Sequence, residues 1–180
     1  MTANQSSPSN PAGDKPFVIS RTFDAPRELV FAAFTQPEHL MQWMGPKGFQ
    51  MTKCSVDLRP GGLFHYGLRA PNGAMMWGKW IFREITPPER LVVEVYFSDE
   101  SAGVTRHPMA ADWPLATLST TTLVEQNGKT LMTLQWRALN ATETEQKRFD
   151  ASHDSMTQGW GGTMNQLTAY LGTIANAGRG

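Results

Sequence analysis

Residues 142–174, TETEQKRFDASHDSMTQGWGGTMNQLTAYLGTI, decide the fold of this 180-residue chain. Large apolar side chains recur at helical spacing through this stretch, and Thr142 with Glu145 matches the pattern of a capping box at its start. We therefore expect one long amphipathic helix at the C-terminal end. A Gly-Trp-Gly-Gly segment begins at Gly159, and because glycine disfavours helix, we expect the helix to bend there or to let another group approach its backbone closely.

The middle of the chain, residues 51–137, changes to a period of two, which is typical of β-strands with one buried face. Turn-forming residues divide it at 59–62, 71–73, 87–88 and 127–128. These signals predict an antiparallel meander of about six strands. Rings and long aliphatic side chains alternate along the strands, so one face of the predicted sheet is heavily aromatic.

The segment before the meander predicts a first strand at 17–23 and two short helices between 24 and 43. Asp24 and Thr35 are the expected N-terminal caps of these helices. The whole order is then strand, two short helices, six strands and a long helix. This order predicts an α+β fold in which a curved antiparallel sheet of six to seven strands wraps around the C-terminal helix.

Charge and composition exclude several classes of partner. Sixteen Lys and Arg balance sixteen Asp and Glu without forming a block, so we expect neither nucleic-acid binding nor attraction to an anionic membrane. Residues 1–16 are rich in Ser, Asn, Pro and Gly and predict a disordered tail, followed by a single domain over 17–175. No segment has the roughly 18 consecutive apolar residues of a spanning helix, which predicts a soluble, cytoplasmic protein without membrane insertion.

The residues that usually carry chemistry form no motif in this sequence. Its four histidines never lie within four residues of one another, and the single cysteine, Cys54, is expected to be a buried strand residue. We therefore predict no metal and no other cofactor. His65 alternates away from its aromatic neighbours, which places it on the outer sheet face, where we expect it to be solvated. Serine-nucleophile and phosphate-binding motifs are also missing, so no catalytic residue is assigned.

The inward rings and thioethers leave two alternatives open: they interlock as an ordinary core, or they surround a cavity. Six tryptophans and ten methionines suit a site that adapts to apolar ligands. Tyr66, Trp80 and Trp160 are the strongest candidates for a cavity wall. The full set of candidate ligand-binding residues is Phe64, Tyr66, Met76, Trp80, Phe82, Val95, Phe97, Met132, Trp136, Met156, Trp160 and Met164.

A resemblance to a known family rests on four segments. They are RTFDAP at 21–26 with WMGP at 43–46, DLRPGG at 57–62, PPERLV at 87–92, and Gly159-Trp160 with Tyr170-Leu171. On these residues the chain resembles the SRPBCC (START-like) superfamily, and within it the bacterial proteins with a domain like the activator of Hsp90 ATPase, over about residues 17–172. The resemblance implies a helix-grip (START/Bet v 1-like) fold with a cavity between sheet and C-terminal helix.

The resemblance and the aromatic sheet face together favour non-catalytic binding of a hydrophobic small molecule, either lipid-like or aromatic and polyketide-like. An enzyme of the cyclase, aromatase or hydrolase kind is the first alternative, with Tyr66, His107 or a buried acid that the sequence does not identify as proton donor. A chaperone-linked module is the second alternative, suggested by the family name alone, and a homodimer stays open. The stretch at 99–114 has no period and looks like an insertion that could cap the cavity.

Overall fold

The computed structural model describes residues 15–177 of the chain. The elements are β1 (Phe17–Phe23), α1 (Arg27–Thr35), α2 (Pro37–Trp43), β2 (Gln50–Val56), β3 (Leu63–Arg69), β4 (Met75–Thr86), β5 (Arg90–Ser98), β6 (Val104–Thr105), β7 (Ala116–Gln126), β8 (Lys129–Leu139), α3 (Glu143–Ala151) and α4 (His153–Ala177). The predicted tail at 1–16 lies, up to residue 14, outside the described residues. No helix within 15–177 is long and apolar enough to cross a membrane.

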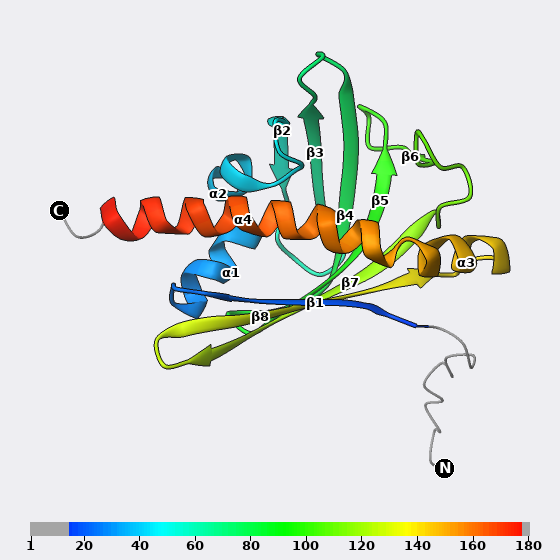
Figure 1. Ribbon diagram of the computed structural model, residues 1–180. Helices are drawn as coiled ribbons and strands as arrows, with labels where there is room; N and C mark the ends of the chain where they lie inside the picture. Colours follow the sequence, from blue (N-terminus) through cyan, green and yellow to red (C-terminus); the bar gives the residue numbers. More distant parts are fainter. Residues whose placement is uncertain (1–14, 178–180) are drawn as a thin grey trace, which may run out of the picture.

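The strands form one antiparallel sheet in the order β1-β8-β7-β5-β4-β3-β2, and the short β6 pairs with β5 outside this path (Figure 1). The meander follows the predicted turns, because each of them joins two strands that are neighbours in the sheet. The first strand pairs with the last, β8, from Phe17 against Trp136 to Phe23 against Thr130. The predicted α+β class and the curved antiparallel sheet around a C-terminal helix are confirmed.

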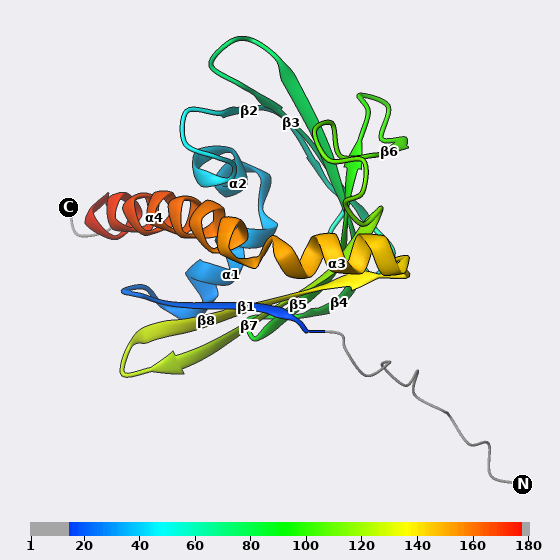
Figure 2. The ribbon, with the colours of Figure 1, turned by 45° about the vertical axis from the view of Figure 1, so that its right-hand side comes forward.

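The sheet curves around α4, which crosses its concave side (Figure 2). Helices α1 and α2 lie on the same side, so that three helices share the space inside the curve. The apolar stripe of α4 faces the sheet: Met164, Leu167 and Leu171 recur at helical spacing and are at most 3% exposed. Burial of this stripe holds the helix against the sheet.

The helical boundaries correct some details of the sequence-based prediction and confirm one of them. The expected single C-terminal helix is divided at Ser152 into α3 and α4, whereas α4 continues without a break through Gly159. The capping box of Thr142 and Glu145 is confirmed at the start of α3. Asp24 and Thr35 were wrong as caps, because Pro26 and Gln36 occupy the N-cap positions of α1 and α2.

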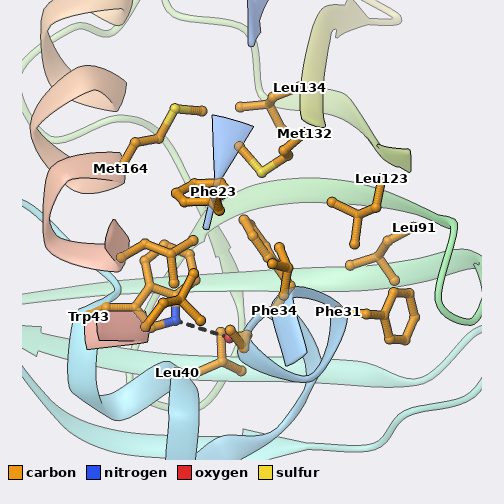
Figure 3. Packing of buried hydrophobic residues seen from close by; sticks show 14 of the residues in the cluster. Phe23, Phe31, Phe34, Leu40, Trp43, Leu91, Leu123, Met132, Leu134 and Met164 are labelled. Atoms are coloured by element: carbon orange, nitrogen blue, oxygen red, sulfur yellow. Dashed lines mark hydrogen bonds between the residues drawn. The ribbon is translucent and has the colours of Figure 1, made fainter. Parts of the chain in front are cut away.

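The core fills one part of the space inside the curve, beneath α1, α2 and the C-terminal half of α4 (Figure 3). Phe23, Phe34 and Met132 are at most 3% exposed and belong to this core. The indole N–H of Trp43 donates a 3.0 Å hydrogen bond to the carbonyl oxygen of Ala33, which satisfies a polar group that burial would otherwise leave unpaired. Side chains therefore interlock at this end of the fold, which is the first of the two alternatives.

Candidate ligand-binding site

The other end of the concave space holds a cavity of about 340 Å³. Its wall comes from the N-terminal half of α4, the inner face of β3, β4, β5, β7 and β8, the connection between α2 and β2, and the segment between β6 and β7. Leu115 lines it and is 41% exposed, so the wall reaches the protein surface there. The volume lies near the lower limit for small-molecule pockets.

Helix α4 supplies one wall through residues that share a helical face. Met156, Gly159, Trp160 and Thr163 line the cavity, and their spacing of three and four residues places them one above another. The connection between α2 and β2 is tied to this helix, since the Gln166 amide donates a 2.6 Å hydrogen bond to the Gly45 carbonyl oxygen. Two segments far apart in sequence thereby form one continuous wall.

Tyr66 enters the cavity by crossing a glycine on the neighbouring strand. Tyr66 pairs with Gly78, and a Cβ atom on Gly78 would lie only 2.4 Å from the Tyr66 hydroxyl oxygen. Any larger residue at position 78 would displace the ring. Burial raises the pKa of Tyr66 to about 12, and the neighbouring Trp80 indole offsets this only in part. The hydroxyl therefore stays protonated at neutral pH.

The structure divides the twelve candidate residues between the cavity and the core. Seven of them line the cavity: Tyr66, Met76, Val95, Phe97, Trp136, Met156 and Trp160. The other five belong to the interlocked core and do not line it: Phe64, Trp80, Phe82, Met132 and Met164. The reason is position along the strands and along α4, because all five lie toward the end of the sheet that α1 and α2 cover. Alternation identifies the inward face of a strand but not which end of that face is filled.

Sequence reasoning missed part of the wall on β7. Thr117 lines the cavity, and Ser119 and Thr121 follow it on the same inward face, all three between 3% and 6% exposed. Small hydroxyl side chains alternate with others here, so the strand has no apolar period to signal an inward face. The pairing of Thr117 with Val95 on β5 was the missing information.

The segment between β5 and β7, predicted only as a capping insertion, closes another side of the cavity. His107, Trp113, Pro114 and Leu115 from this segment line it. An ion pair between Arg106 and Glu145 fastens the segment to the start of α3. The Trp113 ring also packs against the Phe149 ring on α3, with 5.6 Å between the two centroids. The segment is thus anchored by both charge and packing.

His107 is held in a defined tautomer on this segment. The backbone N–H of Met109 donates a 3.0 Å hydrogen bond to its Nδ1 atom, so the neutral ring carries its proton on Nε2. Burial lowers the pKa of His107, and the Arg148 guanidinium lowers it further. The ring also contacts Phe97, with 4.6 Å between centroids. His107 is therefore a neutral wall residue at pH 7.

On the outer face of the sheet, His65 differs from the prediction. It lies on that face as expected, but it is only 9% exposed and not solvated. Its ring stacks on the Trp77 ring with 5.4 Å between the centroids, and Nε2 donates a 3.1 Å hydrogen bond to the carbonyl oxygen of Asp99. The segment after β5 covers this part of the outer face.

Cys54 is half-buried on β2, and burial raises the pKa of its thiol to about 11, so it stays an unreactive thiol.

The chemistry available in the cavity is mostly that of apolar contact. No Asp, Glu, Lys or Arg is among the described residues that line it, and the polar side chains in the wall are uncharged. Within residues 15–177 no three His, Cys, Asp or Glu side chains gather as a metal ion would require. The arrangement can enclose an apolar molecule and offer it a few neutral hydrogen-bonding groups.

Comparisons with other proteins give the same fold. A protein from Mycobacterium smegmatis is 25% identical, with a TM-score of 0.68 over 86% of this chain and 88% of that chain. A protein from Arthrobacter aurescens, solved by NMR, is 26% identical, with a TM-score of 0.73 over 88% of this chain and 86% of its own. An AHSA1 protein from Silicibacter pomeroyi, 18% identical over 89% of this chain and 99% of that one, shares the fold with a TM-score of 0.67. A comparison with curated proteins finds no match.

A family model gives the assignment. The model described as Activator of Hsp90 ATPase homolog 1-like protein matches residues 24–172. This range includes all four segments on which the resemblance rested, apart from the first residues of RTFDAP. The predicted resemblance is thereby confirmed, and the chain belongs to the Activator of Hsp90 ATPase homolog 1-like family.

Proposed function

We propose that this protein binds a hydrophobic small molecule, lipid-like or aromatic and polyketide-like, in the cavity between sheet and α4 without transforming it. The observation that carries the proposal is the cavity of about 340 Å³, lined by rings and thioethers such as Trp160, Trp136 and Met156. Burial of apolar ligand surface at about 25 cal/mol per Å² supplies most of the affinity.

The apolar surface of the wall supports a ligand. The space is open to solvent near Leu115, so water fills it when no ligand is bound, and that water makes few hydrogen bonds to an apolar wall. An apolar ligand that displaces this water gains affinity. Gly159 lines this space and nothing lies within 4 Å of its Cβ position, so a larger side chain there has room to extend over it.

The polar groups of the wall favour binding over catalysis. A general acid works best when its pKa lies near the operating pH, and the pKa of Tyr66, at about 12, is far above it. His107 is neutral at pH 7, because burial lowers its pKa, and its Nδ1 atom is already engaged by Met109. Neither group is matched to proton donation, so the enzyme alternative has less support than binding.

A cavity-filling variant tests the proposal. Gly159 lines the cavity and Gly162 does not, and no atom lies within 4 Å of the Cβ position of either glycine. Gly159→Leu should fill the space and weaken binding at least about tenfold, whereas Gly162→Leu should leave affinity within about twofold. Both variants should remain folded, because each replaces a helical glycine with a better helix former.

The measurement is displacement of Nile red, with native mass spectrometry as a second readout, across fatty acids, steroids and polycyclic aromatics. Binding by the wild type that Gly159→Leu weakens and Gly162→Leu preserves supports the proposal. Failure of every compound to bind the wild type at about 100 µM, or equal binding by both variants, contradicts it. Association with Hsp90 and self-association stay predictions. Analytical ultracentrifugation of the protein alone measures self-association, and the same experiment with Hsp90 added measures the association with Hsp90.

A further inference from the structure

A short stretch of chain closes one side of the cavity without being part of the sheet. Residues 106–115, called the flap from here on, lie between β6 and β7, and four of them line the cavity (Figure 2). Apart from the strand ladders at its two ends, the backbone–backbone hydrogen bonds of the flap within the described part of the chain join His107 to Ala110 and Ala110 to Trp113. These bonds stay inside the flap. The sheet therefore holds its two ends, and only side chains hold its middle.

Two ion pairs of opposite sense hold the flap against α3. Arg106 of the flap pairs with Glu145 of α3, and Arg148 of α3 pairs with Asp112 of the flap, with 3.5 Å between Nε and Oδ1. Glu145 and Arg148 are three residues apart on α3 and share a helical face. We call these four residues the latch. Because each element supplies one cation and one anion, like charges oppose any other register of the flap on α3.

The contacts of the latch are of the kind that break easily. The side chains of Arg148 and Asp112 are 46% and 48% exposed, and that of Arg106 is 51% exposed. Ion pairs at such positions contribute little to stability and are screened by salt. Met109 in the flap is 89% exposed and so adds little packing. A segment with few buried contacts opens locally while the rest of the fold stays intact.

The α3 side of the latch is fixed by the core. Phe149 of α3 is fully buried and forms a second apolar cluster with Phe17 of β1 and Met156 of α4. The flap reaches this cluster only through the Trp113 ring, which packs at the side of Phe149. The flap is therefore the part that moves when the latch breaks, and α3 stays in place.

We propose that the flap is the gate through which the ligand enters and leaves the cavity, and that the latch controls how often this gate opens. The cavity already reaches the surface at Leu115, the last residue of the flap, so a displaced flap widens an existing opening. The inference rests on the proposed function and adds to it the route of ligand exchange and its control.

Binding kinetics test the gate. Association and release are measured by stopped flow from the fluorescence of Nile red, or from tryptophan fluorescence with any uncharged compound that binds. Since these molecules carry no charge, ionic strength acts on the latch and not on the ligand. A gate serves both directions, so a weaker latch should raise both rate constants by the same factor and keep the dissociation constant within about twofold. For the wild type, KCl raised from about 20 mM to about 500 mM should accelerate both rates about two- to fivefold.

Charge reversal locates the effect. Arg148→Asp places two carboxylates opposite each other and should raise both rate constants about three- to tenfold, as should Asp112→Arg. The double variant Arg148→Asp/Asp112→Arg restores an attractive pair and should return both rates to within about twofold of the wild type. Rates are measured at about pH 8, where His107 is neutral because burial lowers its pKa.

Lys147→Asp is the matched control. It changes the charge of α3 by the same amount at the neighbouring position, but Lys147 pairs with Glu143 on the same helix, and its side chain is 74% exposed. This variant should keep the wild-type rates. Thermal unfolding checks that every variant is folded.

The outcomes separate the gate from the proposed function. A bound ligand whose rates change neither with salt nor in the latch variants overturns the inference and leaves binding intact. Faster release with unchanged association also overturns it, because the flap then acts only as a wall, and so does equal acceleration in Lys147→Asp. If neither Nile red nor any compound binds the wild type, the proposed function fails and the inference fails with it. The salt dependence of the wild type decides the question even if a variant does not fold.

Discussion

Single residues shape the cavity by close contacts across neighbouring strands. The Tyr66 ring crosses Gly78 on the inner face, and the Trp77 ring crosses Gly67 on the outer face, where a Cβ atom would lie 2.6 Å from it. The two glycines each face an aromatic residue on the adjacent strand. Glycine is required at both positions because the rings occupy the space of a side chain.

We predict that His107, in the cavity wall, makes the stability of the fold depend on pH. Its pKa lies below the ordinary 6.5 in the folded protein, so the unfolded chain binds a proton more readily. Stability should therefore decrease as the pH falls from about 6.5 toward the lowered pKa, and this contribution should be constant above 6.5. Protonation also removes the acceptor that Nδ1 offers to Met109.

The measurement is the thermal midpoint between about pH 8 and pH 5 for the wild type and for His107→Asn, which keeps an accepting group but does not titrate. The wild type should lose more stability than the variant over this range. Arg148 and Asp112, which form a 3.5 Å ion pair near this ring, are present in both proteins. Identical pH profiles would show that His107 does not make this contribution.

The segment between β5 and β7 depends on α3 for its position. Glu145 accepts a 2.9 Å hydrogen bond from the backbone N–H of Thr142 as part of the capping box, and the same carboxylate pairs with Arg106. These contacts, led by the Thr142 backbone N–H and followed by the Arg106 guanidinium, lower the pKa of Glu145. The Glu145 side chain thus caps the N-terminus of α3 and also holds the segment that closes one side of the cavity.

Glu145→Gln tests this double role, because glutamine keeps the capping acceptor but loses the charge. We expect a loss of roughly 1 kcal/mol in the free energy of unfolding and faster hydrogen exchange in residues 104–115. Glu143→Gln is the control, since Glu143 pairs with Lys147 on the surface and its side chain is 83% exposed. Exchange in 104–115 that does not change in Glu145→Gln would contradict the anchoring role.

Across the fold, the concave space is divided into a filled end and an open end. The filled end lies under α1 and α2, with Met132 fully buried in the core. The open end lies under the N-terminal half of α4, where Met76 lines the cavity. Stability should therefore depend mainly on one end and ligand affinity on the other.

The same substitution at the two ends separates these contributions. Met132→Ala should cost about 2–5 kcal/mol of unfolding free energy and leave ligand affinity unchanged, because it creates a void only in the core. Met76→Ala should cost less stability and change affinity. Chemical denaturation and Nile red titration measure the two quantities. A folded Met132→Ala protein with more than about threefold weaker binding would show that the two ends are not independent.

Local sequence determined most of the elements and the inward faces of the strands that have an apolar period. Turn residues such as Asn127-Gly128 and the alternation of Val93 and Val95 depend only on neighbours in the chain, and so does the capping box at Thr142. The α+β fold class therefore followed from the sequence.

Only the tertiary structure decided where the concave space is filled. Phe64 and Tyr66 stand two residues apart on the same face of β3, yet one lies in the core and the other lines the cavity. The difference arises because α1 and α2 cover one end of the sheet, and the segment that contains His107 and Trp113 closes the other without filling it. Such packing joins residues distant in sequence, and periodicity carries no information about it.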